Sequence, residues 1–177
     1  AKHLAGEARL MEHLRREPAA VEAGLETITR STLAFLEAAR ACGIAGVFYA
    51  AQQATYRLMD RAGYARFGEP YDRRLLEAAS GLWLNMLHLH GEAVMFDVAV
   101  TYPVQVINWH DLEAPPSLGN ALTQTKMALC GGLRQWETMV YGAPEAVRAE
   151  ALHALEATAG RRFILGTGCV TPIIAPT

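Results

Sequence analysis

The chain has 177 residues, of which 51% are hydrophobic and 19% are charged, and its formal net charge is −2. This composition is typical of a globular protein, and the length suits one domain with one core. The small net charge gives no electrostatic reason to expect nucleic-acid binding, and no apolar stretch approaches the roughly 20 residues of a membrane span. Three cysteines without a CxxC spacing argue against a secreted disulfide framework, so we expect a cytoplasmic protein.

Helical spacing of apolar residues alternates along the chain with short continuous apolar runs. A long helix is predicted over 17–42, with Pro18 in its first turn and Gly43 just past its end. Further helices are predicted over 69–83, 116–128 and 143–160, with one or two helical turns within 92–103. The apolar runs, which are typical of buried parallel strands, cover 43–52, 84–91, 104–110, 129–133 and 161–169.

Five strands separated by helices predict an α/β fold with a parallel sheet and helices outside it. Two architectures fit this pattern. One is a small doubly wound domain, and the other is the C-terminal part of a (β/α)8 TIM barrel whose first strands are absent. Both place functional residues at the carboxyl ends of the strands.

Polar and sulfur-containing residues follow the predicted strands at that end. In strand order they are Gln52 and Gln53, His88 and His90, Asn108 to Asp111, Gly131 and Gly132, and Cys169. This grouping is the most informative feature of the sequence, because it gathers chemically active side chains where such a sheet would hold a site.

His88 and His90 form a candidate metal site. Residues two apart on a strand point to the same face, so both imidazoles can converge on one ion. Imidazole and thiolate are good ligands for zinc, and Cys169 would supply a third ligand from across the mouth of a closed barrel. The alternative is that the histidines bond to neighbouring carbonyl groups and Cys169 packs as a small apolar residue.

The remaining strand-end residues are candidates for contact with a substrate. We expect Asn108 and His110 to take part in catalysis and Trp109 to form a pocket wall, together with Gln52 and Gln53. The alternative for the third strand is an ordinary strand end whose Asp111 caps the next turn. Gly131 and Gly132 would let a ligand approach the backbone closely, or would only form a tight turn.

Five motifs in order are similar to the carboxyl-terminal portion of the uroporphyrinogen decarboxylase superfamily. They are "FLEAARACGIAGVFYAAQ", "LHLHG", "LCGGL", "YGAPEAVRAEALHAL" and "RRFILGTGCVTPIIAPT". The resemblance implies that residues 1–177 are one domain of a (β/α)8 barrel. It also implies that the domain lacks its first strands and stops just short of its final helix.

The superfamily has two chemical branches, and the decarboxylase branch is one alternative for this chain. Its members act on a tetrapyrrole in porphyrin biosynthesis, as carboxy-lyases without a metal. The resemblance places their late histidine at Cys169 and their serine near Ala51. Both departures count against decarboxylase chemistry here.

The other branch contains zinc-dependent methyltransferases that use a corrinoid, and the ligand motif resembles this branch more closely. His88 matches the histidine of its H-x-C motif, Cys169 matches its late cysteine, and His90 stands in place of its other cysteine. The resemblance implies that zinc holds a substrate thiol as thiolate, which attacks a methyl group carried by a corrinoid partner protein. Candidates for the fourth zinc ligand are Glu92, Gln53 and a water molecule.

A third possibility is a non-catalytic half-barrel. An open sheet leaves two unpaired edges, and proteins usually cover such edges. Self-association into a homodimer would cover them.

Overall fold

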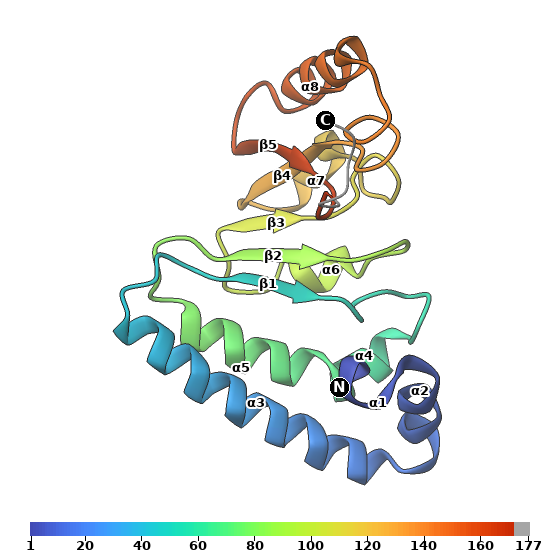
Figure 1. Cartoon of the computed structure of the whole chain (residues 1–177), viewed down its shortest axis with the longest axis vertical. Helices are drawn as coiled ribbons and strands as arrows, with labels where there is room; N and C mark the ends of the chain where they lie inside the picture. Colours follow the sequence, from blue (N-terminus) through green and yellow to red (C-terminus); the bar gives the residue numbers. More distant parts are fainter. Residues whose placement is uncertain (172–177) are drawn as a thin grey trace.

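A computed structural model describes residues 1–171 of the chain. Its five strands form one parallel sheet in the order β1-β2-β3-β4-β5 (Figure 1). They are β1 (Phe48–Ala51), β2 (Met86–Leu89), β3 (Val106–Asn108), β4 (Ala128–Leu133) and β5 (Phe163–Thr167). The order never reverses, as it would in a doubly wound sheet, and it is the order of consecutive strands in a (β/α)8 barrel.

The predicted helices are present, several of them shorter than expected. They are α3 (Pro18–Ala41), α5 (Glu69–Ala79), α6 (Phe96–Ala99), α7 (Leu118–Gln124) and α8 (Pro144–Thr158). Helix α5 ends at Ala79 rather than at residue 83. At this end, the Ser80 hydroxyl donates a hydrogen bond to the Glu77 carbonyl at 2.7 Å. Among residues 1–171, no helix is long and apolar enough to cross a membrane.

Three further helices are not expected from the sequence: α1 (Lys2–Ala5), α2 (Glu7–Arg16) and α4 (Arg61–Phe67). Helix α4 begins at a side-chain cap, because the Asp60 carboxylate accepts a hydrogen bond from the Gly63 N–H at 2.7 Å. Residues 172–177, which end the last motif of the family resemblance, lie outside the described part of the chain.

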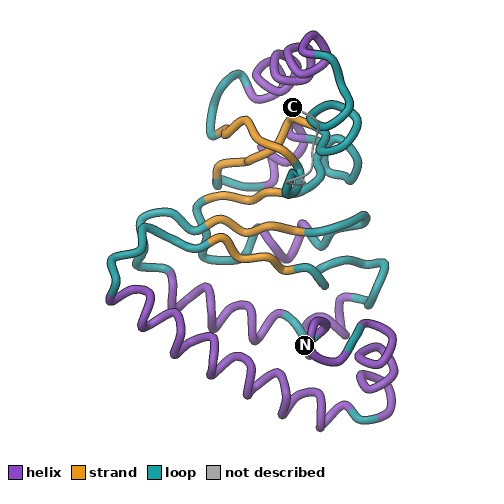
Figure 2. The backbone as a smooth tube through the Cα atoms, in the orientation of Figure 1, coloured by secondary structure: helices purple, strands orange, loops and turns teal. Residues whose placement is uncertain are grey.

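The core lies between the helices and one face of the sheet (Figure 2). Leu87, Ile107 and Leu129 point to this face and are 0% exposed, packed among helical residues such as Leu76. These strand residues alternate with others that point to the opposite face, as strand geometry requires.

Within residues 1–171, the opposite face of the sheet, called the open face below, is exposed at its edge strands and filled at its centre by its own side chains. Phe48 is 58% exposed and Ile164 is 39% exposed on this face, at the two edge strands. The strand register places Ala50, His88, Asn108, Cys130 and Ile164 in one row across it. The predicted site residues His88 and Asn108 therefore lie at the centre of the open face.

This arrangement predicts different costs for the same substitution on the two faces. Ile107→Ala should lower the free energy of unfolding by about 2–5 kcal/mol, because it leaves a cavity in the packed core. The matched control Ile164→Ala removes the same atoms from a partly exposed site and should cost about 1 kcal/mol or less. Urea denaturation of both variants measures the difference, and equal costs would contradict a core confined to the helical side.

Candidate metal centre

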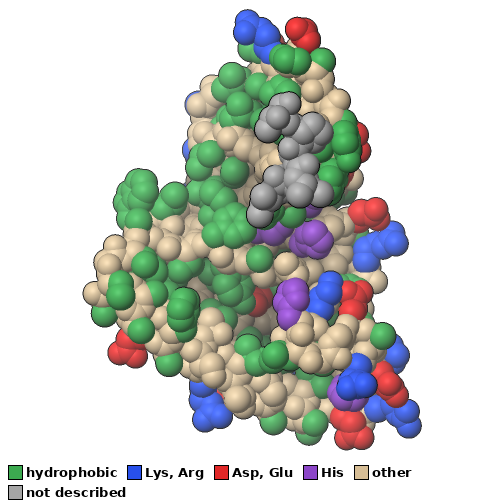
Figure 3. All heavy atoms as spheres, viewed as in Figure 1, with side chains coloured by type: hydrophobic (Ala, Val, Ile, Leu, Met, Phe, Trp, Pro, Cys, Tyr) green, Lys and Arg blue, Asp and Glu red, His purple; other side chains and the backbone are tan. Residues whose placement is uncertain are grey.

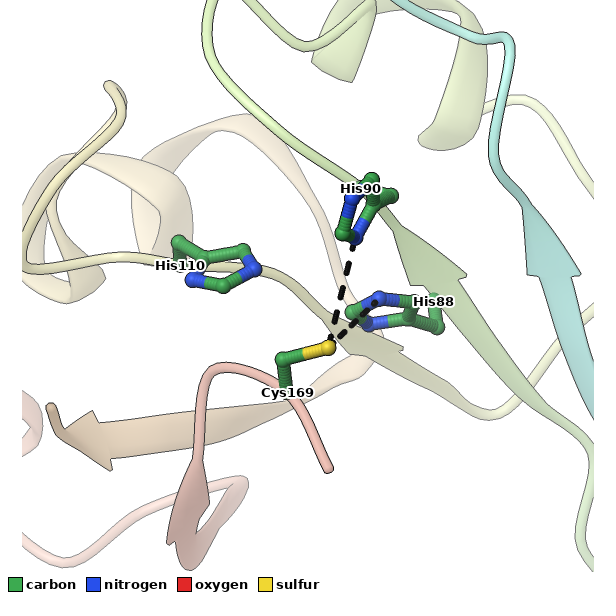
Figure 4. Close-up of side chains that lie close together, drawn as sticks. All are labelled: His88, His90, His110 and Cys169. Atoms are coloured by element: carbon green, nitrogen blue, oxygen red, sulfur yellow. Dashed lines mark hydrogen bonds between the residues drawn. The ribbon is translucent and has the colours of Figure 1, made fainter. Parts of the chain in front are cut away.

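Four potential metal ligands from three strand ends converge above the sheet (Figure 4). They are His88, His90, His110 and Cys169, and their ligand atoms all lie within 4.8 Å of one another. The Cys169 sulfur is 3.8 Å from His88 Nε2 and 4.0 Å from His90 Nδ1. The expected convergence of the two strand histidines on Cys169 is therefore present, and His110 joins it.

Asn108 fixes the orientation of the His88 ring. The Asn108 Nδ2 group donates hydrogen bonds to the carbonyl groups of Cys130 and Thr167, at 2.9 and 3.0 Å. Its Oδ1 atom must therefore be the acceptor that lies 2.7 Å from His88 Nδ1. His88 then carries its proton on Nδ1, and the lone pair on Nε2 points toward Cys169.

His110 has a similar arrangement. Its Nδ1 atom lies 3.5 Å from a Glu113 carboxylate oxygen, and its Nε2 atom is buried without a hydrogen-bond partner within residues 1–171. A buried nitrogen without a partner is costly unless something binds to it. A carboxylate behind one ring nitrogen and a metal on the other is a common arrangement for histidine ligands.

The environment favours neutral imidazoles, the form that binds metals. Burial lowers the pKa of His88, against the effect of its bond to Asn108, and the neighbouring rings of His90 and His110 lower it further. Burial also lowers the pKa of His90, as do the nearby His110 and Lys2. At neutral pH these two ligands are therefore ready to bind a cation without first losing a proton.

The cluster has dimensions close to those of a zinc site. Tetrahedral zinc, with Zn–N of about 2.0 Å and Zn–S of about 2.3 Å, holds its ligand atoms roughly 3.3–3.6 Å apart. All separations here are below 4.8 Å, so adjustments of about 1 Å in side-chain positions suffice. The donor set of three imidazoles and one thiol, with the unpartnered His110 nitrogen, fits zinc.

Comparison with known proteins establishes the family. The sequence matches the family described as uroporphyrinogen decarboxylase (URO-D) over residues 2–177. The chain belongs to this family. A search of curated proteins found no significant match.

A solved structure, the methyltransferase from Methanosarcina mazei, superposes on this URO-D chain with a TM-score of 0.84 and 17% sequence identity. The match covers 99% of this chain and 51% of the other, so the chain spans about half the length of that structure. At 17% sequence identity, this likeness shows that the two chains share a fold. The five parallel strands are part of a (β/α)8 barrel, as the family resemblance implies.

Trp109 does not line the site of this URO-D chain, contrary to the sequence-based expectation. It is 0% exposed, and its indole N–H donates to the carbonyl groups of Ala114 and Pro116 at 3.2 and 3.0 Å. It packs against Phe96 on the helical side of the sheet, with a ring-centroid distance of 4.9 Å. The reason is strand alternation, which turns Trp109 away from the face that carries Asn108 and His110.

Gly131 and Gly132 accommodate a side chain of the protein. The Gly132 N–H donates to the Asp111 carboxylate at 2.9 Å, and a Cβ atom at Gly131 would overlap that carboxylate. Gly132 also has φ of +98°, which other residues rarely adopt. The absence of side chains here makes room for Asp111, which joins the end of β3 to β4.

Gln52 and Gln53 lie at the end of β1, where both border cavities near the cluster. Glu92, considered above as a fourth ligand, instead pairs with Arg57 at 3.0 Å. His110 occupies the fourth position in the cluster. Strand periodicity could have identified it, because Asn108 and His110 are two residues apart, as His88 and His90 are.

The hydrogen bonds of Asn108 predict the protonation state of one ring. In the metal-free protein at neutral pH, long-range ¹H–¹⁵N NMR should show His88 with its proton on Nδ1. Asn108→Leu removes the acceptor and should release the ring into a mixture of tautomers. The exposed Asn120→Leu is the matched control and should leave the signal unchanged. A wild-type His88 protonated on Nε2 would refute this assignment without any variant.

Proposed function

We propose that this URO-D chain binds zinc through His88, His90, His110 and Cys169 and belongs to a methyltransferase that activates a thiol. The observation that carries this proposal is the convergence of three imidazole nitrogens and one sulfur within 4.8 Å. When bound, zinc would lower the pKa of a thiol that takes the place of one of the four protein groups on the ion. It would hold the sulfur of that thiol as a thiolate, ready to accept a methyl group from a corrinoid.

The protein's own groups have distinct roles in this proposal. His88 presents Nε2 because Asn108 holds its Nδ1 proton, and His110 presents Nε2 because Glu113 faces its other nitrogen. Cys169 contributes the single thiolate. A ligand set with one anionic and three neutral members leaves net positive charge on the ion, which favours an anionic sulfur substrate.

The open face of the sheet would give a corrinoid partner protein access to the cluster. His90 is exposed at the rim, whereas His88 is buried below it. A thiol held among these side chains would therefore be reached from the side that carries no helix within residues 1–171. Within residues 1–171, the outer edges of β1 and β5 are unpaired, which also favours association with further polypeptide, such as a second copy of the chain.

Decarboxylation of a tetrapyrrole is the second candidate, favoured by the family description. In that case the histidines would contact substrate carboxylates and no metal would be needed. The presence of a thiol at residue 169, facing two imidazoles that burial keeps neutral, favours the metal site instead.

Metal analysis of the purified chain tests the proposal. Mass spectrometry after zinc reconstitution under reducing conditions should find about one zinc ion per chain, the number a four-ligand site holds. The double variant His88→Ala, His90→Ala should lose it. The exposed His153→Ala removes an imidazole elsewhere and should retain the wild-type content.

Activity assays separate the two candidate reactions. With methylcobalamin as donor, the zinc-loaded protein should methylate one member of a panel of small thiols, and the double variant should not. Absence of zinc from the reconstituted wild-type protein would reject the methyltransferase proposal. Turnover of uroporphyrinogen by the metal-free protein would support the decarboxylase instead.

A further inference from the structure

A cavity of about 380 Å³ lies between β1 and helices α2 to α5, apart from the metal cluster. Much of its lining is apolar and includes Val21, Leu25 and Ile28 of α3. Figure 3 shows a hollow beside the histidine side chains, with apolar side chains around it. Cavities of this size, mostly apolar with a few polar groups, are typical of small-molecule sites.

Asp72 borders this cavity as a buried carboxylate that is 9% exposed. Its Oδ1 atom accepts a hydrogen bond from the Tyr49 hydroxyl at 2.5 Å, and its Oδ2 atom accepts from Tyr64 and, at 3.1 Å, from Tyr102. Within residues 1–171, no lysine, arginine or histidine forms an ion pair with it. Burial raises its pKa, although the three phenols favour the charged form. A nearby cation would offset the cost of keeping this charge out of water.

Aromatic rings surround the same space. Tyr49, Tyr64, Phe67 and Tyr71 all border the cavity. Burial and the Asp72 carboxylate raise the pKa of Tyr49 and Tyr64, so both phenols remain protonated donors. The faces of aromatic rings attract cations, and cages of aromatic rings are a known means of recognising quaternary ammonium groups.

The hydrogen-bond count selects the kind of cation. A carboxylate offers about four lone-pair positions, and the three tyrosines take up three of them. A primary ammonium has three N–H donors to satisfy and would find one free position on the Asp72 carboxylate. A quaternary ammonium has no N–H donor to satisfy. We propose that this cavity binds a small quaternary ammonium compound, with its charged head beside Asp72 and the aromatic rings.

Gln53 identifies where the rest of that ligand would lie. Both polar atoms of its side-chain amide are buried without a hydrogen-bond partner within residues 1–171. Gln53 borders the cavity and also a neighbouring hollow of about 290 Å³ that His90 lines. A ligand with a hydroxyl or carboxyl arm would satisfy this amide. Lys2 borders both spaces too, but its ammonium is paired with Glu7 at 2.7 Å.

Titration of the chain with choline, monitored by NMR and calorimetry in the presence of a chelator, tests the proposal independently of zinc. Choline should bind to the wild-type protein at least about tenfold more tightly than 3,3-dimethylbutan-1-ol, which has the same shape and no charge. Choline should also bind more tightly than ethanolamine, because of the lone-pair count at Asp72.

Asp72→Asn should weaken choline binding by at least about tenfold and leave the neutral alcohol unchanged. Asp97→Asn is the matched control, because Asp97 accepts hydrogen bonds from Tyr56 at an exposed position. If Asp72→Asn does not fold, the comparison of the three ligands on the wild-type protein still decides. Equal binding of choline and the alcohol, or no binding of choline, would overturn the proposal.

Discussion

The side-chain amide of Asn108 is the interaction on which the candidate site depends. From β3 it contacts His88 of β2, the Cys130 carbonyl of β4 and the Thr167 carbonyl at the end of β5. One buried group thus links four neighbouring strands on the open face of the sheet. Its two N–H donors are both used, so its oxygen has one role, and that role orients the imidazole next to it. The same bonds hold the end of β5 in place, and Cys169 is separated from that end only by Gly168.

The strand alternation explains how much of the site could be predicted from sequence. His88 and His90 are two residues apart, and the spacing alone places both rings on one face. The same reasoning applies to Asn108 and His110, and it turns Trp109 to the other side, where it fills the core. The interpretation of Trp109 as a pocket wall was wrong because it treated neighbouring residues of a strand as one group. The convergence of Cys169 on the histidines depends on the curvature of the sheet, which the chemical character of single residues does not specify.

The predicted fold agrees with the structure for a related reason. Continuous apolar runs predicted five buried strands, and five strands are present in one parallel sheet. Burial was predicted correctly for β2, β3 and β4, but most residues of the edge strands β1 and β5 are partly or fully exposed. Helix α4 was missed because Gly63 and Gly68 resemble loop residues, although Asp60 at its N-cap was a usable signal. The choice between a doubly wound sheet and a barrel rests on strand order, which is decided by contacts between distant segments. Local sequence patterns carry no information about those contacts.

Gln53 lies between the hollow at His90 and the cavity at Asp72, two sites whose buried polar groups are not explained by the stability of the fold. Stability alone accounts for most of the packed helical side of the sheet, where apolar side chains are buried and one carboxylate oxygen of Asp111 accepts a hydrogen bond from the Gly132 N–H. It does not account for a buried amide without partners, an imidazole nitrogen without a partner, and a buried carboxylate without a counter-ion. Gln53 borders both the hollow at His90 and the cavity at Asp72. Because proteins rarely retain such costs without a ligand that offsets them, we interpret both the open face at His90 and the helix-side cavity at Asp72 as binding sites.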